Sequence, residues 1–358
     1  MFLQKIGRFF RTVNYPSYFI FFVTKKCNMN CKMCFYAENL NKQNNEELTI
    51  SEYDKISKCI KVLNILGISG GEPFLRDDLS EIIRVFYRNC EPIIIDLPTN
   101  GFFTDKIIWS IENIMPILKN TTLDLQLSLD GPEHIHDEIR GLKGSFKNVK
   151  ETYNNLLPLR KKYRNLKIKI CTVYSHYNQN CMLDFFDIIK RDFSEIDRLV
   201  LSIVHGSVGN LEAFDFDWNK YFPLCEYTDD YVILKNNRDL HSLFTRALRK
   251  EKNAFLKTVL EKHDMYKKCQ AGEKVIVINE VGDVFPCEPL WSKVGNLRDN
   301  EYNLNDILKS SKMRNFRKEK NEGKCSCLWG LPMSNNILYS PRYYPALITN
   351  MVKMRLRS

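Results

Sequence analysis

Strand-like and helix-like segments alternate along residues 18–206, and this alternation restricts the fold more than any other feature of the sequence. Short apolar runs rich in β-branched and aromatic residues indicate strands, and longer stretches with helical periodicity lie between them. We predict strands at 18–24, 62–69, 92–97, 122–129, 167–174 and 198–204, and helices near 49–60, 77–89, 104–118, 146–163 and 180–192. This order predicts a parallel sheet covered by helices. Six units give a partial (β/α)6 barrel of the α/β class, fewer than the eight that close a barrel.

Two local patterns mark helix starts. Thr49 and Glu52 form a capping-box pattern before the first predicted helix. Ser145 is predicted to cap the fourth helix.

Three cysteines follow the first predicted strand. Cys27, Cys31 and Cys34 have the spacing C-x3-C-x2-C, and each iron of an iron–sulfur cluster is usually held by one cysteine. Three thiolates would hold three irons of a four-iron cluster and leave the fourth open to a substrate or cofactor, as in catalytic metal sites. The alternatives are three unrelated thiols or a zinc loop with a distant fourth ligand. Zinc motifs usually repeat a C-x2-C pair, so the spacing favours a cluster.

Further polar residues lie at the ends of later predicted strands, where barrel active sites form. Gly70 and Gly71 would let the backbone approach a ligand closely, and Glu72 can accept a hydrogen bond from an ammonium group. Ser128 and Asp130 alternate with leucines and therefore share one face of their strand. His134 and His136 follow on a predicted surface loop, where we expect ordinary polar residues. We expect Cys171, within the fifth strand, to be a core thiol.

These motifs occur in the order found in the radical S-adenosylmethionine (SAM) superfamily, which the chain resembles over about residues 18–330. The family often has an aromatic residue before the last cysteine of the loop, whereas here Met33 holds that place. The resemblance implies that Cys27, Cys31 and Cys34 hold a 4Fe-4S cluster and that Glu72 faces the amino group of SAM. The residues that it assigns to cofactor binding are Gly70, Gly71, Glu72, Asn100, Ser128, Asp130, Arg140 and Tyr36. Arg140 would pair with the SAM carboxylate, since a guanidinium group can bind a carboxylate through two hydrogen bonds.

The resemblance also implies a reaction. The reduced cluster cleaves SAM into methionine and a 5′-deoxyadenosyl radical, and this radical abstracts hydrogen from the substrate. A flavodoxin- or ferredoxin-type protein would donate the electron. The cofactor carries out the difficult chemistry, and the protein orients the substrate and excludes water.

A second group of cysteines lies near the C-terminus. Residues 275–287 have the pattern of a β-hairpin with a turn at Gly282, which would bring Cys287 beside Cys269, and a helix is predicted near 303–318. Cys325 and Cys327 complete a set of four thiolates, enough for one further four-iron cluster. This pattern is similar to the SPASM/twitch extension, which carries auxiliary clusters. Two such clusters need more than the five cysteines beyond residue 206, so we expect one. A structural zinc site is the alternative.

Both ends of the chain are apolar and basic. Residues 2–13 place their apolar side chains opposite Lys5, Arg8 and Arg11 on a helical wheel, and the last residues are again apolar and basic. Either helix could pack on the barrel or lie on an anionic membrane surface. The expected division is an N-terminal helix at 1–17, the barrel at 18–206, a helical connector at 207–265, the auxiliary domain at 266–330 and a basic tail at 331–358.

Composition limits the location and partners of the chain. It carries a net charge of +10 without a block of Lys and Arg among aromatic residues, so nucleic acid is not an expected partner. We find no secretory signal ahead of the 12 cysteines, which predicts reduced thiols or metal ligands in the cytoplasm, with possible contact at the membrane surface.

The substrate is the least constrained part of the prediction. Only 26 residues precede Cys27, which leaves no room for the leader-binding domain frequent in peptide-modifying relatives. The basic ends favour a carbohydrate or lipid-linked biosynthetic intermediate, with a ribosomally made peptide or protein as the alternative. Two other classes stay open, a non-catalytic iron–sulfur or zinc protein acting as a redox sensor or scaffold, and a peripheral membrane assembly protein.

Overall fold

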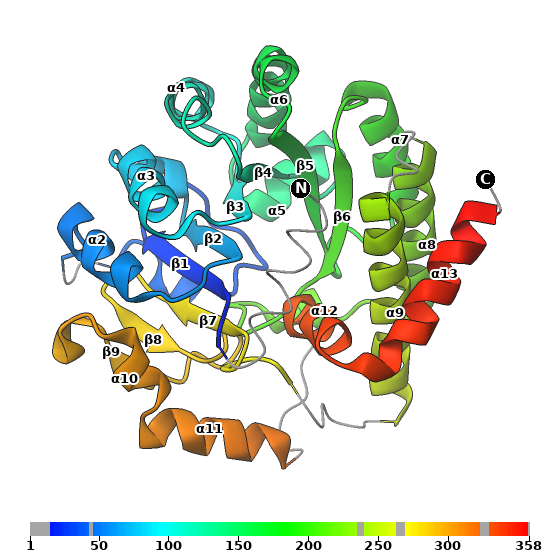
Figure 1. Ribbon diagram of the computed structural model, residues 1–358. Coiled ribbons are helices and arrows are strands. Elements are labelled where there is room, and N and C mark those ends of the chain that lie inside the picture. The colour runs from blue at the N-terminus through cyan, green and yellow to red at the C-terminus, as the bar shows by residue number, and fades with distance from the viewer. Residues whose placement is uncertain (1–14, 43–45, 235–239, 263–268, 323–328, 357–358) are drawn as a thin grey trace.

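The fold is built on one curved sheet with helices along its outer side, as the computed structural model of the chain shows (Figure 1). The structure describes residues 15–42, 46–234, 240–262, 269–322 and 329–356. Within these residues, nine strands are hydrogen-bonded in the order β6-β5-β4-β3-β2-β1-β7-β8-β9. The amphipathic helix predicted at 1–17 lies almost wholly outside the described residues.

The first six strands are parallel to one another and alternate with helices. The strands are β1 (Tyr18–Thr24), β2 (Ile65–Gly70), β3 (Ile94–Thr99), β4 (Thr122–Ser128), β5 (Leu166–Tyr174) and β6 (Arg198–Ile203). The helices are α2 (Ile50–Cys59), α3 (Leu79–Cys90), α4 (Thr104–Ile114), α5 (Glu133–Arg140), α6 (Ser145–Lys162) and α7 (Met182–Asp192). The predicted α/β partial barrel is confirmed.

Side chains alternate along these strands between two environments. In β3, β4, β5 and β6 one set is buried, as Leu97, Leu125 and Ile170 are, and packs under the helices. The other set, on the inner face of the barrel, is mostly half-buried. The inner face therefore keeps contact with solvent, as a face that receives a ligand must.

The predicted hairpin does not stand apart from the barrel. Its strands β7 (Val275–Ile278) and β8 (Asp283–Phe285) are antiparallel, and Gly282 takes the turn at φ +85°. β7 also pairs in parallel with β1, with Tyr18 opposite Val275, and the short β9 (Gly295–Asn296) pairs with β8. The single helix predicted near 303–318 is two helices, α10 (Leu304–Leu308) and α11 (Ser311–Asn321).

Four helices lie at the β6 side of the molecule (Figure 1). They are α8 (Trp218–Leu234), α9 (Leu240–Lys262), α12 (Gly330–Leu338) and α13 (Tyr344–Leu356). α12 and α13 both pack on α9, where Ala247, Ile337 and Leu347 form a small apolar cluster. None of the helices described here has the length and apolar character that crossing a bilayer requires.

The helix starts agree only in part with the sequence prediction. Thr49 and Glu52 form the predicted capping box of α2. Ser145, however, does not cap α6, because the cap residue is Gly144 and Ser145 is the first residue of the helix. Asp137 of α5 replaces it, since its carboxylate accepts hydrogen bonds from the Gly144 and Phe146 N–H groups and from the Ser145 hydroxyl.

Candidate functional site

The three cysteines of the first motif lie on the loop that leaves β1. Asn41 holds the start of this loop through two hydrogen bonds of 3.0 Å, in which its Oδ1 accepts from the Cys27 N–H and its Nδ2 donates to the Cys27 carbonyl. The Cys34 N–H donates to the Cys31 carbonyl at 3.1 Å. The backbone that carries the thiols is therefore fixed by the chain itself.

The C-terminal end of α5 also supports the cysteine loop. The Asn30 and Lys32 N–H groups donate to the Arg140 and Ile139 carbonyls at 3.3 and 2.9 Å. Gly141 ends α5 with φ +65°, and a Cβ atom there would lie 2.7 Å from the Asn30 carbonyl oxygen. The expectation that His134 and His136 lie on a surface loop is thus wrong, because residues 133–140 form a helix packed against the cysteine loop.

The thiols influence one another. Burial is the main cause that raises the pKa of Cys27 to about 11 and that of Cys34 to about 12, and the neighbouring Cys31 adds to both shifts. Burial also raises the pKa of Cys31, although the Arg140 guanidinium, with Nη1 3.8 Å from the Cys31 sulfur, opposes it. Three half-buried thiols with raised pKa values stay protonated at neutral pH unless metal charge replaces the missing water.

These residues fit a cluster better than a single ion. Among the described residues, no three Cys, His, Asp or Glu side chains converge closely enough to hold one metal ion. A four-iron cluster makes no such demand, because each thiolate binds a different iron. Asn28, directly after Cys27, also has a buried Nδ2 group for which the structure gives no acceptor. A buried donor of this kind needs a partner, and a ligand at the cluster would provide one.

Gly70 and Gly71 approach the cysteine loop itself. A Cβ atom on Gly71 would lie 2.1 Å from the Lys26 carbonyl oxygen, and one on Gly70 would lie 2.2 Å from that of Thr24. The Gly71 and Glu72 N–H groups donate to the same two carbonyls at 2.8 Å. The glycines are thus required for contact between β2 and the loop, a reason that the sequence analysis did not foresee.

Glu72 lies beneath this contact and is fully buried. Its carboxylate accepts hydrogen bonds from the Thr99 hydroxyl at 2.8 Å, the Asn100 N–H at 2.7 Å and the Phe74 N–H at 3.2 Å. Burial is the main cause that raises the pKa of Glu72 to about 7. Asn100 in turn donates from Nδ2 to the Asn28 Oδ1 at 2.8 Å. The predicted residues Glu72 and Asn100 therefore meet next to the cysteine loop.

Asp130 and Arg140 form a buried ion pair on the other side of the loop. Asp130 Oδ2 accepts from Arg140 Nε at 2.7 Å and Nη2 at 2.6 Å, while Oδ1 accepts from the Val173 N–H. The remaining Arg140 nitrogen, Nη1, is the one near Cys31. Ser128, the last residue of β4, is half-buried. Asp130 therefore acts first as the anchor of Arg140, and its contact with a nucleoside stays a prediction.

His136 also has a structural role. It is buried within α5, and its Nδ1 accepts from the Asp130 N–H at 3.1 Å. Burial lowers the pKa of His136 well below its usual value, so the neutral ring supports the Asp130 backbone. The prediction of an ordinary surface histidine at this position is wrong.

Tyr36 has contacts unlike those expected of a cofactor ligand. Its hydroxyl donates to Glu280 Oε2 at 2.7 Å, and its ring packs against Phe22 and Trp291. The structure thus places Tyr36 between the cysteine loop and the hairpin. A contact with SAM stays a prediction.

A network of polar residues lines the inner face of the barrel. The Tyr18 hydroxyl donates to Asp96 at 2.8 Å, and Gln126 Nε2 donates to the same carboxylate at 3.1 Å. Lys169 pairs with Asp124 and lies 3.8 Å from Asp96. We name these five residues the inner-face network.

Cys171 borders this network. It is half-buried on the inner face, and its thiol donates to Gln126 Oε1 at 3.1 Å. The expectation of a core thiol is therefore wrong. Strand alternation puts Cys171 on the same face as Lys169, away from the apolar layer under the helices.

A histidine that the sequence analysis missed lies where β6 ends. The His205 ring stacks on Phe35, with ring centroids 5.1 Å apart, and its Nε2 lies 3.4 Å from Glu288 Oε1. Gly206, at φ +77°, lets this strand end approach Phe35 and Pro289. Glu288 could have been singled out from the sequence, because it directly follows the predicted ligand Cys287. No pattern in the sequence pointed to His205.

The auxiliary site is described only in part. Cys269 and Cys287 are both buried, and a Cβ atom on Gly272 would lie 3.0 Å from the Pro286 side chain, so the two cysteine segments lie side by side. Lys320 of α11 donates to the Cys269 carbonyl and to Glu273. Cys325 and Cys327 lie outside the described residues.

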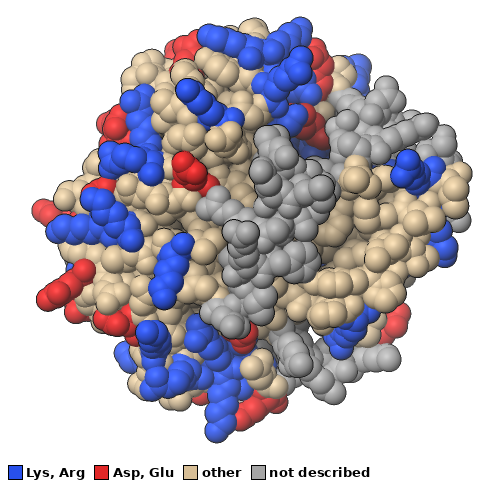
Figure 2. All heavy atoms as spheres, in the orientation of Figure 1, with Lys and Arg blue, Asp and Glu red and all other residues tan. Residues whose placement is uncertain are grey.

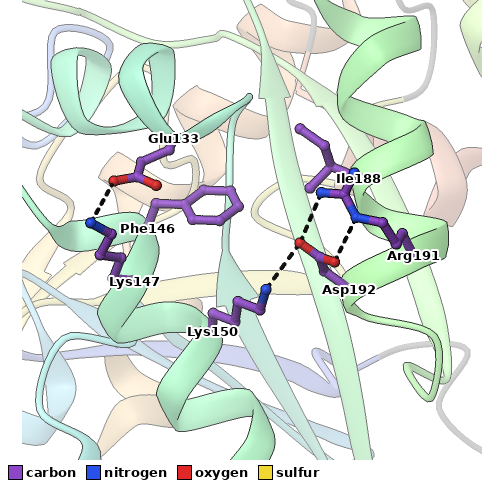
Figure 3. Close-up of a pocket in the computed structure, with 7 residues that line it drawn as sticks. All are labelled: Glu133, Phe146, Lys147, Lys150, Ile188, Arg191 and Asp192. Atoms are coloured by element: carbon purple, nitrogen blue, oxygen red, sulfur yellow. Dashed lines mark hydrogen bonds and ion pairs between the residues drawn. The ribbon is translucent and has the colours of Figure 1, made fainter.

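One shallow pocket lies on the outer, helical side of the sheet, between α5, α6 and α7 (Figure 3). Lys147 pairs there with Glu133, while Lys150 and Arg191 both contact Asp192. Its charged groups are satisfied by one another, and it lies on the side of the sheet opposite the inner face. We place no function in it.

Two known protein families match this chain. The Radical SAM superfamily matches residues 21–187, and the SPASM iron–sulfur cluster-binding domain matches residues 269–328. The chain therefore carries the two domains of a radical SAM enzyme with a C-terminal SPASM domain. Its radical SAM domain implies a 4Fe-4S cluster with SAM, and its SPASM domain implies an auxiliary iron–sulfur cluster.

Named enzymes are similar to this radical SAM chain over most of its length. An AdoMet-dependent heme synthase of Oleidesulfovibrio alaskensis is 25% identical, over 85% of this chain and 77% of that protein. The mycofactocin maturase MftC of Mycolicibacterium smegmatis is 24% identical, over 90% of this chain and 77% of that protein. These relatives and the two domains identify the radical SAM chain as an enzyme.

The fold has solved counterparts. Streptococcus suis SuiB bound to its precursor peptide SuiA superposes with a TM-score of 0.61 at 17% identity, over 94% of this radical SAM chain and 76% of SuiB. At that identity the likeness concerns the fold alone, and it agrees with the partial barrel described above.

Proposed function

We propose that the carboxyl ends of β1 to β4 hold SAM against a cluster on Cys27, Cys31 and Cys34. The observation that carries this proposal is the arrangement of polar side chains on both sides of the cysteine loop. On one side Asn100 is hydrogen-bonded to Asn28 at 2.8 Å, and on the other Arg140 lies 3.8 Å from the Cys31 sulfur. An ammonium group and a carboxylate of one amino acid would find partners of opposite charge in Glu72 and Arg140.

When bound, the cluster and SAM supply a 5′-deoxyadenosyl radical that removes a hydrogen atom from the substrate. The chain's own residues orient and protect this reaction. Asn41 and the end of α5 fix the loop, and Gly71 brings Glu72 beneath it. The half-buried inner face accepts the substrate below the loop. A flavodoxin- or ferredoxin-type protein is the electron donor that we propose.

We further propose that Cys269 and Cys287 hold the auxiliary cluster, together with Cys325 and Cys327. The burial of both cysteines, on segments that lie side by side, supports this assignment. Pairing of β7 with β1 fixes that segment to the barrel, so an auxiliary cluster would have a constant position relative to the cysteine loop.

We propose a ribosomally made peptide or protein as the substrate. The similarity to the maturase MftC, which extends over 90% of this chain, supports a peptide more than the carbohydrate or lipid-linked intermediate favoured by the sequence alone. The inner-face network offers both hydrogen-bond donors and acceptors, as a polar peptide segment requires.

A tetrapyrrole is the second candidate. The similarity to heme synthases favours it, since these relatives match 85–87% of this chain at 25–26% identity. The two candidates predict different hydrogen donors, and this difference can be measured.

The test uses cluster-reconstituted protein with SAM and dithionite, and follows deuterium in the 5′-deoxyadenosine product by mass spectrometry. Peptide, lipid and carbohydrate fractions from source cells grown in deuterated medium are added separately, with a deuterated porphyrin as a fourth arm. We expect deuterium transfer from the peptide fraction, and none with Cys27→Ala. Deuterium transfer only from the lipid, carbohydrate or porphyrin sample would overturn the peptide proposal. It would still agree with radical SAM activity. If no 5′-deoxyadenosine formed at all, the chain would act as a sensor or scaffold.

A further inference from the structure

The last helix of the chain leaves an apolar stripe exposed. α13 packs on α9 through the buried Leu347, whereas Ile348, Val352 and Leu356 are 61%, 52% and 81% exposed. Their spacing of four residues puts all three on one side of the helix. Large apolar side chains exposed together, rather than singly, mark a surface that binds something.

Cations border this stripe on both sides. At about 100° per residue, Arg355 projects about 20° from Ile348, and Lys353 projects about 60° beyond Leu356. Both are exposed. No side-chain carboxylate follows Glu322 in the sequence, whereas five cations do, namely Lys324, Arg342, Lys353, Arg355 and Arg357. Along the right-hand edge of Figure 2, where α13 lies, tan and blue atoms are exposed, with red atoms towards its lower end.

We propose that α13 docks this enzyme on an anionic lipid membrane. Ile348, Val352 and Leu356 would enter the boundary between headgroups and acyl chains, while Lys353 and Arg355 would reach the anionic headgroups. Each basic residue near such a surface adds electrostatic attraction. The partner is thus identified by an apolar stripe with exposed basic residues beside it. The Glu251 carboxylate of α9 also contacts α13, but at Asn350, about 200° around the helix from Ile348.

A second copy of the chain fits this surface less well. A two-fold symmetric contact places the same patch of both subunits against itself. Lys353 and Arg355 of one copy would then lie near their counterparts in the other. Like charges brought together in this way oppose association, whereas anionic lipid headgroups neutralise them.

The experiment is flotation of the full-length, cluster-reconstituted enzyme with vesicles. One set is phosphatidylcholine alone, and the other contains phosphatidylcholine and phosphatidylglycerol in equal amounts. We expect the wild-type chain to float with the anionic vesicles only, and the double variant Ile348→Asn, Val352→Asn to lose about tenfold in partitioning. Lys353→Gln with Arg355→Gln should lose the preference for anionic lipid.

Trp109→Asn with Leu183→Asn is the matched control, because these side chains are 58% and 63% exposed on α4 and α7. It should float like the wild type. Equal iron content and melting temperature of all variants would show that each is folded. Absence of wild-type flotation, or an equal loss in the control, would overturn the proposal. So would a dimer in sedimentation velocity that the Ile348→Asn, Val352→Asn variant abolishes, if vesicles are not bound.

Discussion

Glu72 carries a carboxyl group into a fully buried position, where two backbone N–H groups and one hydroxyl surround it. Burial disfavours the charged form, and the hydrogen bonds only partly compensate. A neighbouring ammonium group would supply the missing counter-charge. The residue is therefore poised to respond to a cationic ligand.

This burial predicts how stability depends on pH. Because the pKa of Glu72 is raised from 4.5 to about 7, the folded chain binds more protons than the unfolded chain between these values. The contribution of Glu72 to the free energy of unfolding is thus largest at low pH. It falls by on the order of 3 kcal/mol as pH rises. In urea unfolding of the cluster-free protein, Glu72→Gln should flatten the profile between about pH 4.5 and 7. An unchanged slope would contradict this assignment.

The Asp130–Arg140 pair gives a second prediction at this scale. Arg140→Met leaves the Asp130 carboxylate buried without its partner, and such losses cost about 3–5 kcal/mol. Adding Asp130→Asn removes the uncompensated charge, so the double variant should be more stable than Arg140→Met alone. Denaturant unfolding of the two variants measures the difference. Simple additivity of the two substitutions would show that the pair is not coupled.

At the scale of elements, α5 connects the cysteine loop to α6. Its C-terminal end bonds to the loop, and Asp137 caps the next helix. One short helix therefore fixes two neighbouring segments. Removing the Asp137 cap should therefore lower the stability of the fold more than it lowers catalytic activity.

Asp137→Ala should lower the free energy of unfolding by about 1–2 kcal/mol, because it removes the side-chain cap of α6. Ser145→Ala should cost less, since Ser145 contributes a single hydroxyl bond to Asp137. Thermal or urea unfolding of the two variants compares these roles. If Ser145→Ala lowered the free energy of unfolding more than Asp137→Ala, Ser145 would be the main capping residue, as predicted from the sequence.

The sequence predicted elements with strong periodicity and missed those fixed by distant contacts. The buried alternation of β3 to β6 was visible in residues such as Leu97 and Ile170, and the capping box at Thr49 was local. The helix at residues 133–140 has only eight residues, and its packing on the cysteine loop is a long-range contact. Pairing of β7 with β1 joins segments far apart in the chain, which no local pattern reveals.

The residues of the candidate site also divide into those that the sequence predicted and those that it missed. Motif positions such as Cys27, Glu72 and Asn100 could be placed from their order along the strands, and the structure brings them together. His205 could not, because a lone histidine at a strand end has no distinguishing pattern. Its stacking on Phe35 depends on the close approach of Gly206.

For the whole molecule, the decisive feature is that the hairpin extends the barrel sheet. β7 lies beside β1, and the hydroxyl of Tyr36, next to the cysteine loop, donates to Glu280 in the turn of the hairpin. The two cysteine regions therefore belong to one continuous structure. Loosening this contact should affect the auxiliary segment first.

Tyr36→Phe tests that connection. It removes the hydroxyl that bonds to the buried Glu280 carboxylate, and an unsatisfied buried acceptor costs about 1–3 kcal/mol. We expect faster proteolysis of the segment after residue 269 while the barrel stays intact. Tyr36→Phe combined with Glu280→Gln should recover part of the loss. Unchanged proteolysis would mean that Tyr36 does not hold the hairpin.

The measurement that tests the account most directly is the iron and labile sulfide content after anaerobic reconstitution. The wild type is compared with a Cys27, Cys31, Cys34→Ala variant and with a Cys269, Cys287→Ala variant. Two four-iron clusters predict about eight irons per chain, falling to about four in either variant. If the Cys27, Cys31, Cys34→Ala variant kept all of its iron, the proposed SAM cluster site would be wrong. If the wild type held only about four irons together with bound zinc, the proposed auxiliary cluster would be wrong.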